Sequence, residues 1–67
     1  KALFEALEEL PETQRLVYIQ NEIEEKTLQQ IAEEQQTNIK TIISRKQYAV
    51  KHLRKRLHQL YKDLDNY

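Results

Sequence analysis

The chain has 67 residues and carries 11 basic and 11 acidic side chains but no cysteine. This length allows one small domain, since domains usually hold about 100–200 residues, and it excludes a large buried core. Disulfides are excluded, and no apolar run approaches the ~18 residues that span a bilayer. We expect a cytoplasmic protein stabilised by helix packing alone. Because its first residue is Lys1, we expect a single domain over residues 1–67, excised from a longer chain.

The net charge of zero is unevenly distributed along the chain. Residues 1–36 carry three basic side chains and nine glutamates, a net charge of −6, whereas residues 37–67 carry eight basic side chains and two aspartates, a net charge of +6. This asymmetry indicates a polyanion, an acidic partner or a membrane surface for the basic half. The alternative is that the two halves neutralise each other within one bundle.

The first half of the chain predicts two helices, because its apolar residues recur at steps of three and four. A short helix is predicted over about residues 2–9. Its apolar row consists of Leu3, Leu7 and Leu10, with Phe4 beside them. A second helix is predicted from Pro11, which the first turn of a helix tolerates, to about Glu22. Its apolar side is predicted to carry Leu16, Ile19, Gln20 and Ile23, with Val17 at the edge.

A third, short helix is predicted over about residues 28–35. Thr27 and Gln30 form the pattern of a capping box at its start. Ile31 and Ala32, together with Leu28, are expected to point inward. The stretch QQTN over residues 35–38 then breaks the pattern, and Thr37 and Asn38 both offer side-chain oxygens to the N–H groups of a new helix.

The last helix is predicted to run from Ile39 to about Leu64. Its apolar row consists of Ile39, Ile42, Ile43, Ala49, Val50, Leu53, Leu57, Leu60 and Leu64. The last four leucines step by 4, 3 and 4 residues, as in a packing seam. Lys46 points into this apolar sector. Either its stem lies along the core with the ammonium at the rim, or the core ends there.

A short helix, a turn and a longer helix form the outline of a helix-turn-helix. Ala32 is small enough for the two helices to cross closely, and Ile31 and Ile42 are expected to join them. The sequence therefore predicts an all-α fold. It would be a right-handed four-helix bundle with a helix-turn-helix, no wing, and a long C-terminal helix.

Opposite the apolar sector, on a wheel of about 100° per residue, the long helix carries polar and basic residues. The candidate DNA-binding residues are Asn38, Lys40, Thr41, Ser44, Arg45, Tyr48, Lys51 and Lys55. Short polar residues near the N-terminus with longer cations behind them suit entry into a major groove and neutralisation of phosphates. A solvated surface face is the alternative, because any surface helix carries lysines.

Three motifs occur in order along the chain. They are LP-x-x-QR from Leu10 to Arg15, IAE from Ile31 to Glu33, and TNIKTIISR from Thr37 to Arg45. A long basic helix follows them. From about Leu7 to Leu60 the chain thus resembles region 4 of bacterial RNA polymerase sigma factors, especially those of the extracytoplasmic-function (ECF) type.

The resemblance implies a function in transcription initiation. Region 4 recognises the upstream (−35) promoter element through its helix-turn-helix and docks on the flap of the polymerase β subunit, and anti-sigma proteins often mask it. By position, Thr41, Ser44 and Arg45 would approach bases or nearby phosphates. The backbone contacts would fall mainly to Lys40, Lys51 and Lys55. Arg45 is the strongest candidate, because a forked guanidinium bonds a base edge or a phosphate in bidentate fashion.

The chain departs from the family pattern in the turn. Where the family has an aliphatic residue, a glycine and an aliphatic residue, this chain has Gln35, Gln36 and Thr37, and Glu25 stands where another glycine is frequent. Glycine is favoured in the turn at Gln35 to Thr37 because one residue takes a left-handed conformation, which costs roughly 1 kcal/mol or more for other residues. We expect a looser turn. We also expect either a displaced recognition helix or a domain that depends on polymerase to hold it on the promoter.

No enzyme, metal or cofactor site is predicted. His52 and His58 are six residues apart, off the spacing for joint ligation, and are expected at the surface or rim. Other functions stay open. They are another helix-turn-helix regulator such as a response-regulator output domain, an interaction or dimerisation module using the Leu53–Leu64 seam, and a basic tail for an anionic membrane or a calmodulin-like protein. A membrane is not among the partners we expect.

Overall fold

The computed structural model describes residues 2–65, apart from the side chains at positions 61 and 63–65. Its elements are α1 (Ala2–Glu8), α2 (Glu12–Tyr18), the π-helical turn η1 (Ile19–Ile23), α3 (Leu28–Glu34) and α4 (Ile39–Asp65). Over this range the chain contains helices and turns but no strand. The predicted all-α class, with four α-helices of which the last is the longest, is confirmed.

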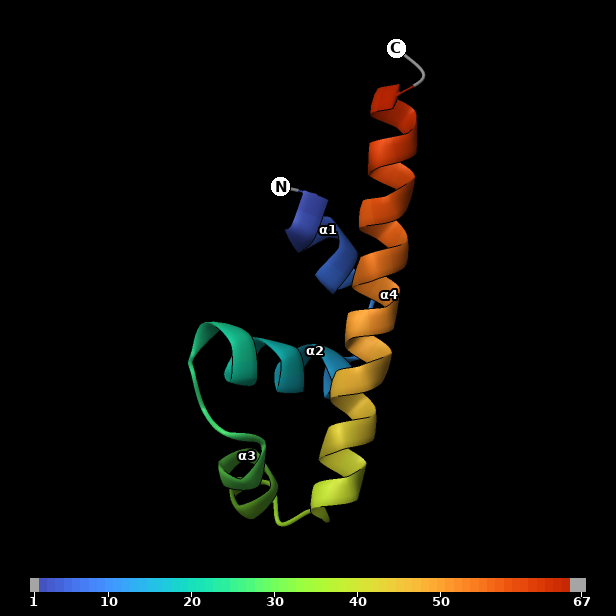
Figure 1. The fold of residues 1–67 in the computed structure, drawn as a ribbon. Coiled ribbons are helices and arrows are strands. Elements are labelled where there is room, and N and C mark those ends of the chain that lie inside the picture. The colour runs from blue at the N-terminus through green and yellow to red at the C-terminus, as the bar shows by residue number, and fades with distance from the viewer. Residues whose placement is uncertain (1, 66–67) are drawn as a thin grey trace.

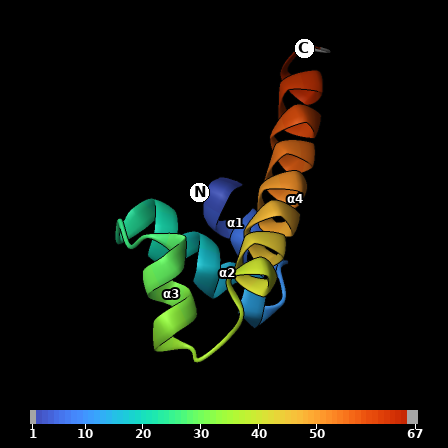
Figure 2. The same ribbon diagram turned by 60° about the horizontal axis from the view of Figure 1, so that its bottom comes forward.

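α4 is the axis around which the other helices are arranged (Figure 1). α1 packs against the middle of α4, while α2 and η1 run outward from it and α3 lies near its N-terminal end. Figure 2 shows the short connection from α3 into α4 and the angle between α3 and α2. The molecule measures 47 × 19 × 16 Å, because α4 extends past the other helices.

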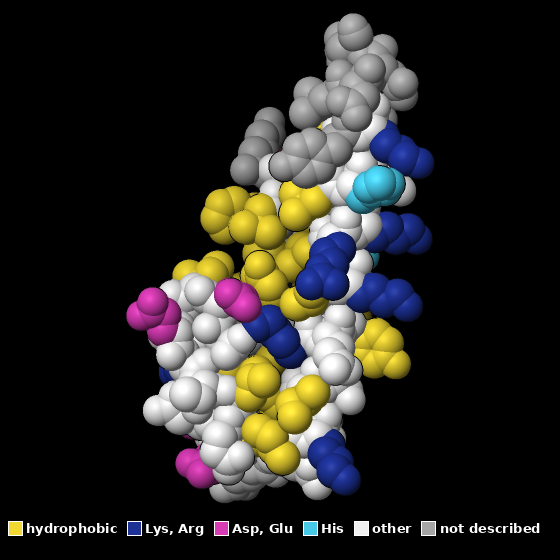
Figure 3. Space-filling model, viewed as in Figure 1, with side chains coloured by type: hydrophobic (Ala, Val, Ile, Leu, Met, Phe, Trp, Pro, Cys, Tyr) yellow, Lys and Arg dark blue, Asp and Glu magenta, His cyan; other side chains and the backbone are white. Residues whose placement is uncertain are grey.

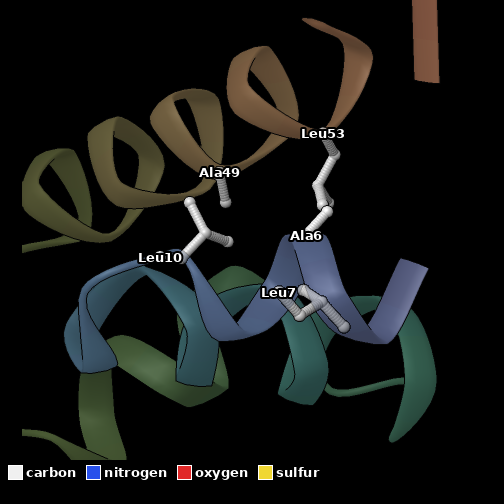
Figure 4. Packing of buried hydrophobic residues seen from close by; sticks show 5 residues of the cluster. All are labelled: Ala6, Leu7, Leu10, Ala49 and Leu53. Carbon is white, nitrogen blue, oxygen red and sulfur yellow. The ribbon is translucent and has the colours of Figure 1, made fainter. Parts of the chain in front are cut away.

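The core consists of two clusters of buried side chains. Ala6, Leu7 and Leu10 of the N-terminal segment pack against Ala49 and Leu53 of α4 (Figure 4), with Tyr18 partly buried at the edge. The second cluster consists of Val17, Ile31, Ala32 and Ile42, with Leu28 and Ile39 at its edge. Because this second cluster joins α2, α3 and α4, it sets the angle between the two helices of the helix-turn-helix. The prediction that Ile31 and Ile42 join these helices is confirmed.

The prediction of which residues form the apolar side of the second helix is wrong. Val17, expected at the edge, is fully buried, whereas Leu16 and Ile23 are exposed. The reason is that α3 and α4 cover the Val17 side, so the longer apolar row faces away from them. In α1, likewise, Ala6 is buried while Leu3 and Phe4 are exposed.

The end of the second helix is also different from the prediction. At Ile19 the α-helix passes into a π-helical turn, in which the Glu24 N–H donates to the Ile19 carbonyl over 3.0 Å. The Asn21 side chain then donates from Nδ2 to the Lys26 carbonyl over 2.8 Å. Between them, Glu25 adopts a φ of 62°. The loop into α3 is thus held by an unusual turn, a side-chain hydrogen bond and one left-handed residue.

The caps of α3 and α4 largely match the prediction. The Gln30 N–H donates to Thr27 Oγ1 over 3.0 Å and the Thr27 N–H donates to Gln30 Oε1 over 2.9 Å, which completes the capping box. At α4 the Lys40 N–H donates to Asn38 Oδ1 over 2.7 Å. Thr37 does not cap α4 as expected. Its hydroxyl donates to the Gln35 carbonyl over 3.0 Å, because α3 leaves carbonyls without partners at its end.

Candidate nucleic-acid interface

The turn between α3 and α4 closes on a left-handed residue. Gln36 has a φ of 52°. Its N–H donates to the Glu33 carbonyl over 3.2 Å, and the Thr37 N–H donates to the Ala32 carbonyl over 2.9 Å. This pair of bonds is a Schellman motif, which usually has glycine at its left-handed position. The expected left-handed residue is therefore confirmed at Gln36, where it costs roughly 1 kcal/mol relative to glycine.

The candidate DNA-binding residues share one side of α4. The exposed members are Asn38, Lys40, Thr41, Ser44, Tyr48, Lys51 and Lys55, and Arg45 is half-buried. In Figure 3, Lys and Arg side chains line the edge of α4 that points away from α2 and α3. From Lys40 to Lys55 the side extends about 22 Å along the helix. We call these eight residues the polar face of α4.

Two members of the polar face already have partners within the chain. Asn38 uses its side-chain oxygen to cap α4. Arg45 donates from Nη1 to Gln35 Oε1 over 3.3 Å, which links the second turn of α4 to the end of α3. The sequence did not predict this second contact, because nothing in the pattern pairs residues ten positions apart across a turn.

Lys46, next to the polar face, points the opposite way. Its Nζ lies 2.7 Å from Glu22 Oε1, donates to Asn21 Oδ1 as well, and stands 5.6 Å from the centre of the Tyr18 ring. The side chain is only 14% exposed. Of the two alternatives for Lys46, the first is therefore confirmed: the stem lies along the core and the ammonium reaches the rim.

α1 is joined to α4 by charged side chains around Glu9. The carboxylate Oε1 lies 3.0 Å from Arg56 Nε and 2.8 Å from His52 Nε2. His58 is exposed, so both histidines lie at the rim or surface as predicted. Over the described residues no three His, Cys, Asp or Glu side chains come together in a way that would hold a metal ion.

A groove of about 460 Å³ opens between α1 and the C-terminal half of α4. Its apolar lining consists of Ala2, Leu3, Ala6, Leu53, Leu57 and Leu60. Leu57 and Leu60 are each 41% exposed, so among the described members of the predicted packing seam only Leu53 is buried. The side chain of Leu64, its last predicted member, lies outside the described residues. Figure 3 shows hydrophobic side chains gathered where α1 meets α4.

The acidic side chains lie mostly on α1 to α3, away from the polar face. One of them, Glu34, accepts a hydrogen bond from Lys26 Nζ over 2.9 Å. This bond raises the pKa of Lys26 above its ordinary value of 10.5, although desolvation opposes it. Ion pairs of Lys46 with Glu22 and of Arg56 with Glu9 join the two halves of the chain, whereas the charged residues of the polar face are all basic. None of the described helices is long and apolar enough to cross a membrane.

Comparison with protein families finds one match. Residues 1–53 match the family described as Sigma-70, region 4. The comparisons with curated proteins and with solved structures found no match. The matched range covers α1 to α3, the turn at Gln36 and the N-terminal half of α4, including all of the polar face except Lys55. The chain therefore belongs to the sigma-70 region 4 family, whose members are DNA-binding domains of transcription factors and not enzymes.

Proposed function

We propose that this chain recognises the −35 element of promoters as region 4 of an ECF-type sigma factor, within RNA polymerase holoenzyme. The observation that carries the proposal is the polar face of α4. It begins directly after the helix-turn-helix turn, it is exposed over most of its length, and its only charges are positive. A helix of this kind suits a major groove, where its first turns meet base edges and its cations meet phosphates.

The roles of the single residues follow from their reach. Thr41, Ser44 and Arg45 lie on the first two turns and are proposed to approach bases or nearby phosphates. The longer cations of Lys40, Lys51 and Lys55 are proposed to neutralise phosphates. Asn38 fixes the start of the helix, and Tyr48, which is 61% exposed, is proposed to lie against the nucleic-acid backbone.

The ECF assignment and the polymerase contact rest on different features. The three sequence motifs support the ECF type. The groove between α1 and α4, with its exposed Leu57 and Leu60, offers an apolar surface to the β flap of core polymerase or to an anti-sigma protein. Family membership favours this function over a response-regulator output domain or a membrane-binding tail.

Fluorescence anisotropy tests the recognition of DNA. The chain is titrated onto a labelled duplex carrying an ECF-type −35 element and onto a scrambled duplex, at low and at moderate salt. We expect tighter binding to the element, and we expect Arg45→Ala to abolish that preference. Lys62→Ala, at an exposed position about two helical turns beyond Lys55, is the control. Equal and salt-sensitive binding to both duplexes would contradict base reading, because phosphate attraction alone has that signature.

A second experiment tests the docking surface. Leu57→Glu places a charge in the groove and is expected to abolish binding to an isolated β-flap fragment while leaving duplex binding intact. His58→Glu adds the same charge one residue along, at an exposed position that does not line the groove. Equal flap binding by the two variants would refute docking at this groove.

A further inference from the structure

Gln35 is the residue directly after α3, at its C-cap, and it precedes the left-handed Gln36. Its backbone is held at both ends. Its N–H donates to the Ile31 carbonyl over 2.9 Å, and its carbonyl accepts from the Thr37 hydroxyl over 3.0 Å. The side chain is half-buried. The Oε1 atom of Gln35 is therefore attached to a fixed point of the backbone, from which it reaches across to α4.

The group that this oxygen meets is the guanidinium of Arg45. The contact runs from Nη1 to Oε1 over 3.3 Å, between partly buried side chains. A guanidinium carries five N–H donors, so one bond to Gln35 leaves most of its donors free. None of the ion pairs in the described part of the chain involves Arg45. The guanidinium is thus held by a neutral acceptor that does not cancel its charge.

A neutral acceptor has a specific advantage next to a binding surface. A carboxylate at the same place would compete with phosphates and base edges for the guanidinium, whereas an aliphatic side chain would not hold it at all. An arginine that is ordered before its ligand arrives loses less rotamer freedom on binding. The gain falls mainly on contacts that need a defined geometry, such as a bidentate bond to a base edge.

We infer that Gln35 is a positioning residue for DNA recognition, and that its side-chain oxygen orients the Arg45 guanidinium for sequence-specific contact. This inference rests on the proposed function of the polar face. It also gives a reason for the replacement of an aliphatic residue by glutamine in this turn. Gln35 itself touches no DNA and acts through Arg45.

The first part of the test measures Arg45 in the chain without DNA. Restricted rotation of the guanidinium separates the nitrogen signals of Nη1 and Nη2 in NMR spectra, and Arg45→Lys identifies which signals belong to this residue. We expect separate signals in the parent chain and merged signals in Gln35→Leu. In Gln35→Glu, which keeps an acceptor, the signals should stay separate. Gln29→Leu makes the same change on the exposed side of α3, where the lost bond is to Glu33, and should leave the Arg45 signals separate.

The second part measures the ratio of affinities for the −35 duplex and the scrambled duplex. One neutral hydrogen bond corresponds to about a threefold to tenfold change, so Gln35→Leu should lower the ratio by that factor. Its affinity for the scrambled duplex should stay unchanged, since no charge is altered. Gln35→Glu should weaken binding to both duplexes, because its carboxylate opposes the phosphates.

The outcomes separate the inference from the proposed function. If Gln35→Leu leaves the Arg45 signals separate, or keeps the full affinity ratio while Arg45→Ala lowers it, the positioning role of Gln35 is overturned. If Arg45→Ala itself leaves the ratio unchanged, base reading by Arg45 is overturned, and a role for Gln35 in specificity falls with it. Circular dichroism of each variant confirms that the helices are intact, and Gln35→Ala replaces Gln35→Leu if the latter does not fold.

Discussion

Lys46 Nζ lies 2.7 Å from Glu22 Oε1, a carboxylate 24 residues earlier in the chain. The same ammonium contacts Asn21 and stands over the Tyr18 ring, and Asn21 in turn bonds the carbonyl of Lys26 just before α3. One lysine of α4 thus connects this helix to the π-helical turn and, through Asn21, to the start of α3. This contact supports the angle of α4 from the side opposite the polar face.

Lys46→Ala should therefore lower the free energy of unfolding by about 1–2 kcal/mol, since it removes a partly screened ion pair, a hydrogen bond and a cation–π contact. Urea unfolding followed by circular dichroism measures the change. Lys62→Ala makes the same replacement at an exposed site near the other end of α4 and should change stability by less than about 0.5 kcal/mol. Equal effects of the two variants would show that the Lys46 contacts contribute nothing.

Gln36→Gly should stabilise the chain. Gln36 has a φ of 52°, and glycine removes the strain of that conformation, although it also makes the unfolded chain more flexible. The net gain should be about 0.5–1 kcal/mol, or several degrees in Tm for a domain of this size. Gln47→Gly, in the exposed interior of α4, should instead destabilise by about 1 kcal/mol. A loss of stability in Gln36→Gly would contradict the left-handed turn.

Two adjacent isoleucines provide a matched test of the core. Ile42 is fully buried in the cluster that joins α2, α3 and α4, whereas Ile43 is 37% exposed. Ile42→Val should cost about 1 kcal/mol, because it leaves a space in packed surroundings. Ile43→Val carries the same change in helix propensity and should cost less than half as much. Thermal unfolding of the two variants measures these costs. A larger loss of stability in Ile43→Val than in Ile42→Val would contradict the packing of Ile42 against α2 and α3.

The bond from Lys26 to Glu34 raises the pKa of Lys26 above 10.5, so its stabilisation of the fold depends on pH. The stabilisation is fully present below the unfolded pKa and is lost as the pH rises through the folded pKa. NMR titration of the Lys26 ammonium should show the raised pKa, and Glu34→Gln should lower it. Glu33→Gln, which removes the neighbouring carboxylate, should have a much smaller effect. If Glu34→Gln leaves the pKa of Lys26 unchanged, the contact between the two side chains does not form in solution.

Lys51 gives a test of the polar face that does not depend on base reading. If it neutralises one phosphate, Lys51→Ala should weaken binding to the −35 and scrambled duplexes alike. The slope of log K against log salt concentration should become less negative by about 0.9. Anisotropy titrations at several salt concentrations measure this slope, and Lys62→Ala should leave it unchanged. An unchanged slope in Lys51→Ala would remove this residue from the interface.

The features that the sequence predicted correctly depend on neighbouring residues. The Thr27 capping box, the Asn38 cap and the left-handed Gln36 each involve groups within about five positions of one another. A residue pattern contains this information directly, because the backbone of a short segment has few alternatives. The helices could therefore be placed to within a few residues.

The features that the sequence did not predict depend on which helices pack against each other. The contacts of Glu9 with His52 and Arg56, and that of Lys46 with Glu22, join residues more than twenty positions apart. Periodicity also showed that α2 and α4 have apolar sides, but not how far a neighbour covers them. Val17 and Leu57 were misjudged for that reason. The Gln35–Arg45 bond belongs to the same class, since it requires the crossing angle of α3 and α4.

α4 runs through 27 residues from Ile39 to Asp65 without interruption, and the chain has no glycine and no proline beyond Pro11 that could bend it. The polar face and the groove at Leu57 and Leu60 therefore lie on one continuous helix, which fixes the angle between them about the helix axis. Each residue between them contributes about 100° of rotation and about 1.5 Å of separation. The number of residues between the two surfaces thus determines their distance and relative orientation. A residue inserted between them would rotate one surface relative to the other without changing the residues of either.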